Sequence, residues 1–134
     1  MSNTPADDET ARQTLLRYFA ELSALDPEAI SAVFEEDGEI DDPVGSGTRS
    51  GRAAVADYFA KGLCSASQSI NIEILYVHAS GGLVAAHWRM SAESPTGARA
   101  NAEGIDVLEV SGDGLIRRAE GYWDQFAFRQ AMSS

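Results

Sequence analysis

The hydrophobic period of this chain changes near residue 69, and this change restricts the fold more than any other feature. Before residue 69, apolar residues recur three and four positions apart, which is the spacing of a buried helix face. From Ser69 onward, apolar and polar residues alternate, which is typical of strands that bury one side. Helices grouped before antiparallel strands predict an α+β domain, with the helices packed on one face of a curved sheet.

Three helices are expected in the first half of the chain. Thr4 is the expected cap of the first helix, with Pro5 at its first position and acidic residues in its first turn. The second helix is short, begins at Asp26 and ends at residues 37–38, and the third is capped by Ser50. The side chains expected to face the core are Leu15, Tyr18, Phe19, Leu22 and Leu25, then Ile30, Val33 and Phe34, then Val55, Tyr58 and Phe59.

Four strands are expected in the second half, separated by polar or glycine-containing turns. A shorter extended segment is expected at residues 39–42, because the residue before Pro43 is pushed toward β conformation. The sequence SGDG at residues 111–114 is a strong hairpin signal. The expected strands cover residues 69–76, 83–91, 99–110 and 115–128.

The length and the charge of the chain limit its organisation and its partners. A chain of 134 residues has room for one packed core, so residues 1–134 are expected to form a single domain. With 21 acidic and 10 basic residues the net charge is −11. Such a surface repels phosphate backbones and anionic lipid, so neither nucleic acid nor membrane is an expected partner. Neutral or cationic small molecules remain as partners.

The remaining composition excludes several kinds of site. Cys64 is the only cysteine, so no intrachain disulfide can form, and no cluster of Cys and His offers a metal site. The N-terminus lacks the basic and apolar regions of a signal peptide, and no apolar run is long enough to span a membrane. We therefore expect a cytoplasmic protein without a metal ion.

Asp106 departs from the pattern expected for the strand over residues 99–110. Alternation places it on the same face as Ala100, Leu108 and Val110, which otherwise suits the core. A carboxyl group alone in the core raises its pKa and stays neutral, and a neutral carboxyl can donate a hydrogen bond to an oxyanion. The alternative is a shifted register or a bulge that turns Asp106 toward solvent.

Two more polar residues have both a chemical and a structural interpretation. Tyr18 lies on the apolar face of the first expected helix, where its hydroxyl needs a ligand or a backbone carbonyl as partner. Asp42 ends the extended segment before Pro43, where it is either a turn acid or a general base facing a cavity. Of the consecutive pair Tyr122 and Trp123, one side chain is expected to line the interior, as core packing or as a ligand contact.

Four segments together resemble the Δ5-3-ketosteroid isomerases. The stretch EEDGEIDDPVGSGTRSGRAAVADYF is similar to the family segment whose catalytic base precedes a proline, and this base corresponds to Asp42. RYFAELSALDPEAI resembles the segment with the oxyanion-hole tyrosine, here Tyr18. GIDVLEVSGDGLI resembles the strand with the protonated acid, here Asp106, and EGYWDQF resembles the strand whose tryptophan lines the steroid cleft, here Trp123.

The resemblance implies both a fold and an activity. The fold is the cone-shaped α+β barrel of the nuclear transport factor 2-like and SnoaL-like superfamily, with three N-terminal helices and a strongly curved, mostly antiparallel sheet. The activity is movement of the double bond of a 3-oxo-Δ5-steroid to the conjugated Δ4 position, without a cofactor, by a homodimer. Trp123, Tyr58 and Phe59 are then expected to bind the small apolar substrate. The superfamily also contains polyketide cyclases, dehydratases and non-catalytic ligand-binding modules, so the fold alone does not give the reaction.

The implied mechanism needs two carboxyl groups in opposite protonation states. Asp42, expected in an exposed turn, is ionised and moves the proton, whereas Asp106 is neutral and donates with Tyr18 to the steroid oxygen. Better-known isomerases carry tyrosines that bond to the catalytic tyrosine at positions that correspond here to Phe34 and Phe59. Tyr58 is then either a replacement for those tyrosines or part of the cleft lining.

Overall fold

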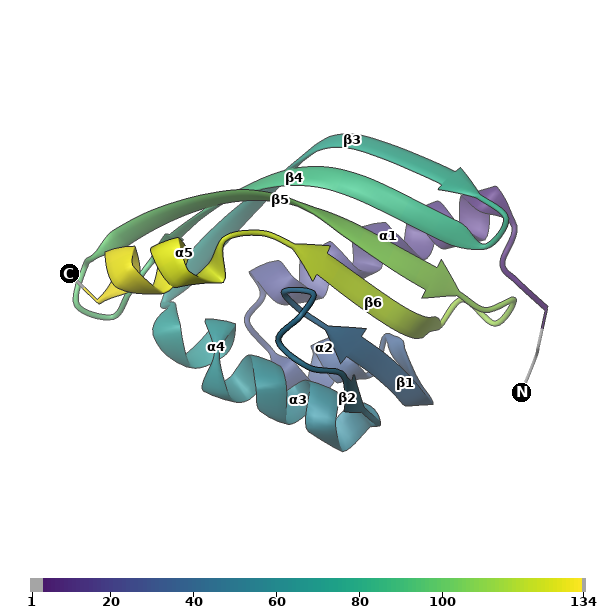
Figure 1. The fold of residues 1–134 in the computed structure, drawn as a ribbon, viewed down its shortest axis with the longest axis horizontal. Coiled ribbons are helices and arrows are strands. Elements are labelled where there is room, and N and C mark those ends of the chain that lie inside the picture. The colour runs from purple at the N-terminus through teal and green to yellow at the C-terminus, as the bar shows by residue number, and fades with distance from the viewer. Residues whose placement is uncertain (1–3, 134) are drawn as a thin grey trace.

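The computed structural model describes residues 4–133. The helices of this part of the chain pack against one curved sheet (Figure 1). In this part of the chain the strand order is β2-β1-β6-β5-β4-β3. The helices are α1 (Asp8–Ser23), α2 (Pro27–Ser31), α3 (Arg52–Lys61), α4 (Leu63–Ala66) and α5 (Gln125–Met132). The strands are β1 (Phe34–Asp41), β2 (Arg49–Ser50), β3 (Ser69–Ser80), β4 (Leu83–Glu93), β5 (Arg99–Val110) and β6 (Ile116–Tyr122).

The sheet is mostly antiparallel, as predicted. The long strands β3, β4, β5 and β6 pair antiparallel in chain order, because short turns join each to the next. The exception is β1, which pairs with β6 in parallel and with β2 antiparallel. This parallel contact brings the end of the first half of the chain beside the end of the second half.

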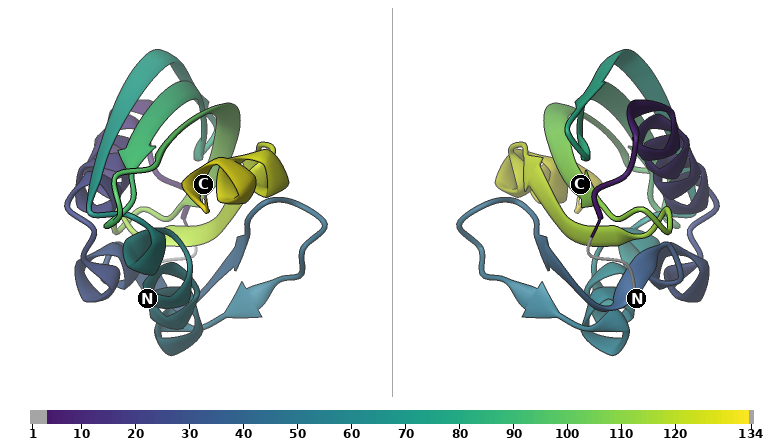
Figure 2. Two further views of the ribbon diagram at one scale, coloured as in Figure 1. Left: turned by 90° about the vertical axis from the view of Figure 1, so that its left-hand side faces the viewer. Right: turned by 90° about the vertical axis from the view of Figure 1, so that its right-hand side faces the viewer.

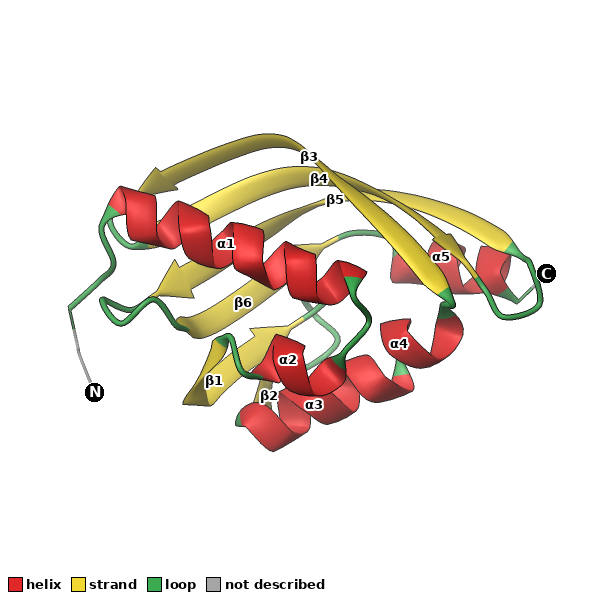
Figure 3. Cartoon of the chain, turned by 180° about the vertical axis from the view of Figure 1, so that it is seen from behind, coloured by secondary structure: helices red, strands yellow, loops and turns green. Residues whose placement is uncertain are grey.

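The sheet curves around α1, and the predicted α+β class with a cone-like shape is confirmed (Figures 2 and 3). Seen end-on in Figure 2, β3 to β6 bend around the interior instead of lying flat. A register shift between Ile74 and Tyr76 in β3 adds to this curvature. The apolar face of α1 packs inside with buried side chains of β4, β5 and β6, so helix and sheet share one core.

The first helix begins later than expected. Asp7, and not Thr4, is its cap, because the Asp7 carboxylate accepts a hydrogen bond from the Thr10 amide at 2.7 Å. Pro5 forms an isolated bridge with Ser111 instead of opening the helix. The segment before α1 is therefore paired with the turn after β5, and this pairing keeps Pro5 out of the helix. Of the predicted domain over residues 1–134, residues 1–3 and 134 lie outside the described part.

The predicted second helix is too long, and the predicted cap of the third helix lies one residue too early. Phe34 begins β1 instead of ending α2, since its strand pairs with β6, a partner more than eighty residues away in sequence. Ser50 lies in β2 and does not cap α3. Gly51 occupies the cap position, where its φ of 93° is a conformation that favours glycine.

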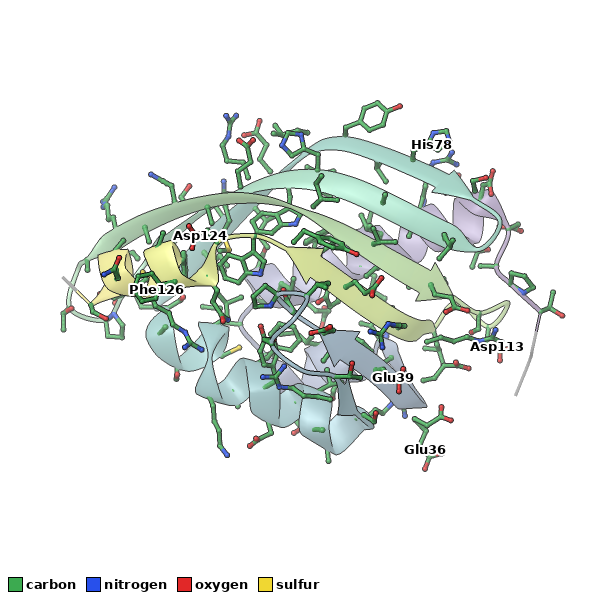
Figure 4. All side chains as sticks on the ribbon, viewed as in Figure 1. Glu36, Glu39, His78, Asp113, Asp124 and Phe126 are labelled. Atoms are coloured by element: carbon green, nitrogen blue, oxygen red, sulfur yellow. The ribbon has the colours of Figure 1, made fainter. Side chains whose placement is uncertain are left out.

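The expectation that the last strand extends to residue 128 was wrong. The strand β6 ends at Tyr122, and the Asp124 carboxylate then caps α5 by accepting from the Ala127 amide at 3.0 Å (Figure 4). Phe128 and Met132, four positions apart, are the buried side chains of this helix. No helix among residues 4–133 is long and apolar enough to cross a membrane.

Candidate functional site

A cleft opens between the inward face of the sheet and the helices α1, α3, α4 and α5. Its walls are mainly apolar, with Leu22, Ile72, Met90 and Phe128 among them. Such a mainly apolar cleft with a few polar groups is the usual form of a small-molecule site. All six residues selected from the sequence lie on its lining: Tyr18, Asp42, Tyr58, Phe59, Asp106 and Trp123.

Asp106 faces the interior of the sheet, and its side chain is only 5% exposed. It pairs with Ala86 of β4 and Gly121 of β6 in unbroken register, so the alternative of an outward bulge at this residue is wrong. Its Oδ1 accepts a hydrogen bond from the indole N–H of Trp88 at 2.9 Å. Its Oδ2 has no hydrogen-bond partner among the described residues and is left to carry a proton toward the cleft.

Burial controls the protonation of Asp106. Removal from water raises the pKa of this carboxyl well above its usual value, and the negative charge of Asp42 raises it further. The bond from Trp88 acts in the opposite direction and is the smaller influence. Burial therefore favours the neutral carboxylic acid form of Asp106, which can donate a hydrogen bond to a ligand.

Asp42 follows β1 directly, at a cis peptide bond to Pro43, and it does not lie in the exposed turn that was expected. Its side chain is 8% exposed, because Trp123 and Tyr58 cover it. The indole N–H of Trp123 donates to Oδ1 of Asp42 at 2.7 Å, and the hydroxyl of Tyr58 donates to its backbone carbonyl at 2.5 Å.

The surroundings of Asp42 favour the ionised form more than those of Asp106. Burial raises the pKa of Asp42, but the hydrogen bond from Trp123 and the positive charge of Arg49 oppose the increase, and the pKa is about 6. Arg49 lies over the ring of Tyr58, 4.4 Å from its centroid. Asp42 is thus mainly a carboxylate at pH 7 and is available as a base.

Tyr18 projects from α1 into the same cleft and is 1% exposed. Its hydroxyl has no hydrogen-bond partner within residues 4–133, so of the two alternatives the backbone carbonyl is excluded and a ligand remains. Burial and the two nearby acids raise its pKa well above the usual value, which keeps the hydroxyl protonated. A neutral hydroxyl without a protein acceptor is ready to donate to a bound oxygen atom.

Tyr122, the last residue of β6, and Trp123, which follows it, point to opposite sides of the sheet, as predicted. Trp123 lines the cleft, where its ring makes edge contacts with Trp88 at 5.9 Å and with Phe128 at 5.5 Å between centroids. Tyr122 is 46% exposed on the outer side. The indole of Trp123 therefore serves both as a wall of the cleft and as a hydrogen-bond donor to Asp42.

Comparison with known proteins agrees with this arrangement. The sequence profile of the SnoaL-like domain matches residues 15–119, which is most of the chain. The chain belongs to the SnoaL-like domain family. Its expected place in the SnoaL-like, nuclear transport factor 2-like superfamily is thereby confirmed.

Two relatives of this SnoaL-like chain are informative. A steroid Δ-isomerase of Nocardioides simplex is 28% identical over 112 residues, which are 84% of this chain and 88% of that protein. A solved structure of SalBIII, described as an epoxide hydrolase/cyclase-like enzyme with a role in pyran ring formation in the polyether salinomycin, superposes with a TM-score of 0.77. It is 27% identical in sequence, and the match covers 89% of this chain and 94% of that one.

In this SnoaL-like domain, the side chain of Tyr18 has an apolar environment. The rings of Phe34 and Phe59 meet Tyr18 edge-on, at centroid distances of 5.8 Å and 6.4 Å. Tyr58 is a part of the cleft lining and not a replacement for the missing tyrosines, because its hydroxyl donates to Asp42. Among the described residues no polar group bonds to the Tyr18 hydroxyl, which leaves it available to a ligand.

Two residues of the site were not selected from the sequence. Trp88 occupies an inward position of β4 between Ala86 and Met90, and this alternation was the available signal for it. Gly121 lies between the two acids, since a Cβ at this position would overlap Oδ1 of Asp42 and lie 3.3 Å from Oδ1 of Asp106. A glycine in a buried strand is a recognised sign of such a close approach.

The two histidines and the cysteine do not line the cleft. His87 contacts the Glu103 carboxylate at 3.0 Å, and His78 projects from the outer side of β3 (Figure 4). Burial raises the pKa of the Cys64 thiol, which favours its unreactive form. Within residues 4–133, no three His, Cys, Asp or Glu side chains are grouped in a way that could bind a metal ion.

Proposed function

We propose that the protein is a Δ5-3-ketosteroid isomerase. The observation that carries this proposal is the pair of buried carboxyl groups in one apolar cleft, each held by an indole N–H, with burial raising the pKa of Asp42 to about 6 and the pKa of Asp106 well above its usual value. The similarity to a steroid Δ-isomerase over most of the chain supports the same reaction. An enzyme that transfers a proton within a neutral, apolar substrate needs one base and a fixed set of neutral donors.

Each polar group has one role in this reaction. The substrate ketone binds at the deep end, where Tyr18 and Asp106 donate hydrogen bonds to the C3 oxygen. Asp42 removes a proton from C4, and the negative charge of the dienolate accumulates on that oxygen. Asp42 then returns the proton at C6 and gives the conjugated Δ4 ketone. This division of labour is the one established for ketosteroid isomerases, and it uses only side chains of the protein.

The apolar walls support the proposed substrate class. The rings of Trp123, Tyr58 and Phe59 line the cleft, which suits a flat polycyclic molecule. Exclusion of water strengthens the hydrogen bonds at the oxyanion and keeps Asp106 neutral. Small apolar ketosteroids are therefore the proposed substrates.

The test uses 5-androstene-3,17-dione and follows the ultraviolet absorbance of the conjugated enone. Asp42→Ala should almost abolish the reaction. Asp106→Leu and Tyr18→Phe should each slow it less, by about a hundredfold to a thousandfold, since each removes one preorganised donor. Near-ultraviolet circular dichroism of each variant checks that folding is retained. Full activity of Asp42→Ala would show that another group is the base.

A second candidate is a cyclase-like or dehydratase enzyme acting on a polyketide-like substrate. The structural similarity to the epoxide hydrolase/cyclase-like enzyme favours this candidate, which would use Asp42 as the acid–base group in a different reaction. A non-catalytic module for hydrophobic ligands is the third. Saturable binding of a phenolic steroid without formation of the enone would favour one of these two over the isomerase.

We also propose that the protein is a homodimer. Across the outer face of the sheet, Tyr76, His87, Ile105 and Tyr122 are successive cross-strand partners, and they form one continuous row. Tyr76 is 66% exposed, and Ile105 and Tyr122 are each 46% exposed. A second copy of the same face would cover these side chains.

A further inference from the structure

The two ends of the cleft differ in charge. The deep end contains the two acids, Asp42 and Asp106, whereas the charged residues at the open end are Lys61 of α3 and Arg129 of α5. No Asp or Glu is among the described residues that line this open end. In a chain with 21 acidic and 10 basic residues, an opening with only cations differs from the rest of the surface.

Arg129 is the cation at this opening that remains available. Lys61 is paired with Asp57 at 3.1 Å. Arg129 is exposed, and within residues 4–133 its guanidinium has no carboxylate partner. By contrast, several other arginines each contact an acid, namely Arg12, Arg89, Arg99, Arg117 and Arg118.

A second groove continues from the opening and passes Arg129. It shares four lining residues with the cleft and extends to the turn at residues 94–96 and to Ser133. The hydroxyls of Ser65 and Ser133 donate to backbone carbonyls of their own helical turns. The hydroxyls of Ser94 and Thr96 contact each other at 3.0 Å, and Arg129 is the only charged residue among the described residues that line this groove, so its guanidinium is the group best suited to an anion there. The shared lining residues are Ser65, Ala66, Phe128 and Arg129.

We propose that the substrate carries a carboxylate on the end opposite its ketone, and that Arg129 binds this carboxylate where cleft and groove meet. The direction of the substrate in the cleft rests on the proposed function. A guanidinium matches a carboxylate with two parallel hydrogen bonds. The ionised Asp42 at the deep end repels the same carboxylate, so both ends favour one orientation of the substrate.

The test compares two ligands that differ only in this group, 3-oxo-4-androstene-17β-carboxylic acid and its methyl ester. Both tryptophans of the chain, Trp88 and Trp123, line the cleft, so intrinsic fluorescence reports binding without turnover. Arg129→Ala should weaken binding of the acid by about threefold to fivefold, the range of an exposed ion pair, and leave the ester unchanged. Arg129→Glu should weaken the acid further, and added salt should reduce the effect in the wild type.

Arg17→Ala is the matched control, because it removes one exposed charge from α1 outside the cleft. It should leave the binding of both ligands unchanged. Equal losses for acid and ester in Arg129→Ala would overturn the carboxylate proposal, since packing and not charge would then explain Arg129.

The assay of 5-androstene-3,17-dione separates this proposal from the proposed function. Isomerisation of this neutral substrate together with no Arg129-dependent preference for the acid would leave the isomerase standing and overturn the carboxylate site. An Arg129-dependent preference without isomerisation would support the carboxylate site and overturn the isomerase. Absence of binding by both ligands, together with no isomerisation of 5-androstene-3,17-dione, would overturn both.

Discussion

Two aspartic acids in one cleft differ in protonation because their neighbours differ. Asp42 has an indole donor, Trp123, and the nearby positive charge of Arg49. Asp106 has an indole donor too, Trp88, but no cation among the causes that shift its pKa, and it experiences the charge of Asp42. A cation near one carboxyl and not the other thus separates a base from a hydrogen-bond donor.

The pH dependence of the reaction follows from Asp42 and Arg49. Because the base must be ionised, kcat/KM should fall about tenfold per pH unit below the pKa of about 6 and level off above it. Arg49→Gln removes a charge that lowers the pKa of Asp42, so the midpoint should move to higher pH. Arg49→Lys keeps the charge and should keep the midpoint. A midpoint that stays the same in Arg49→Gln would contradict this account.

Trp88 should act through the orientation of Asp106. Trp88→Phe keeps an aromatic ring but removes the N–H that fixes Oδ1 of Asp106, so kcat should fall about tenfold with a smaller change in KM. Trp123→Phe is the matched comparison, because it removes the donor to Asp42 and should move the pH midpoint upward.

The two indoles are thereby distinguished by kinetics. The midpoint near pH 6 should be unchanged in Trp88→Phe, since Asp42 retains its own donor. A shifted midpoint in Trp88→Phe, or an unchanged kcat, would exclude the positioning role of Trp88.

At the scale of elements, the parallel pairing of β1 with β6 brings the acids together. Asp41 at the end of β1 is opposite Glu120 of β6, and Gly121 is opposite Asp106 of β5. Asp42 and Asp106 therefore lie on either side of Gly121. The amide of Val44 donates to the Gly121 carbonyl at 2.8 Å and fixes the turn after Asp42 to the same strand.

Gly121 should be essential to this junction. Gly121→Ala places a methyl group against the Asp42 carboxyl, so the variant should lose about 1–3 kcal/mol of unfolding free energy in urea titrations, and most of its activity. The double variant Gly121→Ala/Asp42→Ala relieves the overlap. The loss of unfolding free energy in the double variant should be smaller than the sum of the two single losses by about 0.5–3 kcal/mol. Additive losses of unfolding free energy would mean that the added methyl group clashes with atoms other than those of the Asp42 carboxyl.

The hydrophobic pattern of the sequence predicted correctly those elements that interactions between nearby residues determine. The apolar face of α1 and the alternation of β5 were read correctly, including the inward position of Asp106. The errors at Phe34 and at residues 123–128 arose where distant pairing or a single capping side chain decides the structure. Phe34 belongs to an apolar helical face in the sequence, but a partner strand more than eighty residues later makes it part of β1.

The site was predicted only as far as single residues and a family resemblance allow. Tyr18 and Asp106 stood out as polar groups on apolar faces and Asp42 as an acid before a proline, and the resemblance placed the three in one site. The bond from Trp88 to Asp106 joins neighbouring strands diagonally, and the contact of Gly121 with both acids depends on the register of three strands. Such contacts follow from tertiary register, which one sequence does not contain.

At the scale of the whole molecule, net charge and exposed apolar surface have opposite effects on self-association. A net charge of −11 opposes the approach of two copies, whereas the row that contains Tyr76, Ile105 and Tyr122 favours it. Beside this row, an acid is paired with a base, because Arg89 contacts Glu73 at 3.0 Å. Local pairing reduces the repulsion where the two faces would meet.

The wild-type protein should therefore behave as a dimer of 14.3 kDa subunits in size-exclusion chromatography with light scattering. Ile105→Lys should give monomers, because it places an unpaired ammonium group in the middle of the apolar row. Lysine is chosen because it lowers the net negative charge, so dissociation could not be explained by greater repulsion. Leu16→Lys is the control, since Leu16 is similarly exposed but lies on α1. A monomeric wild type, or a dimeric Ile105→Lys, would show that this face is not the interface.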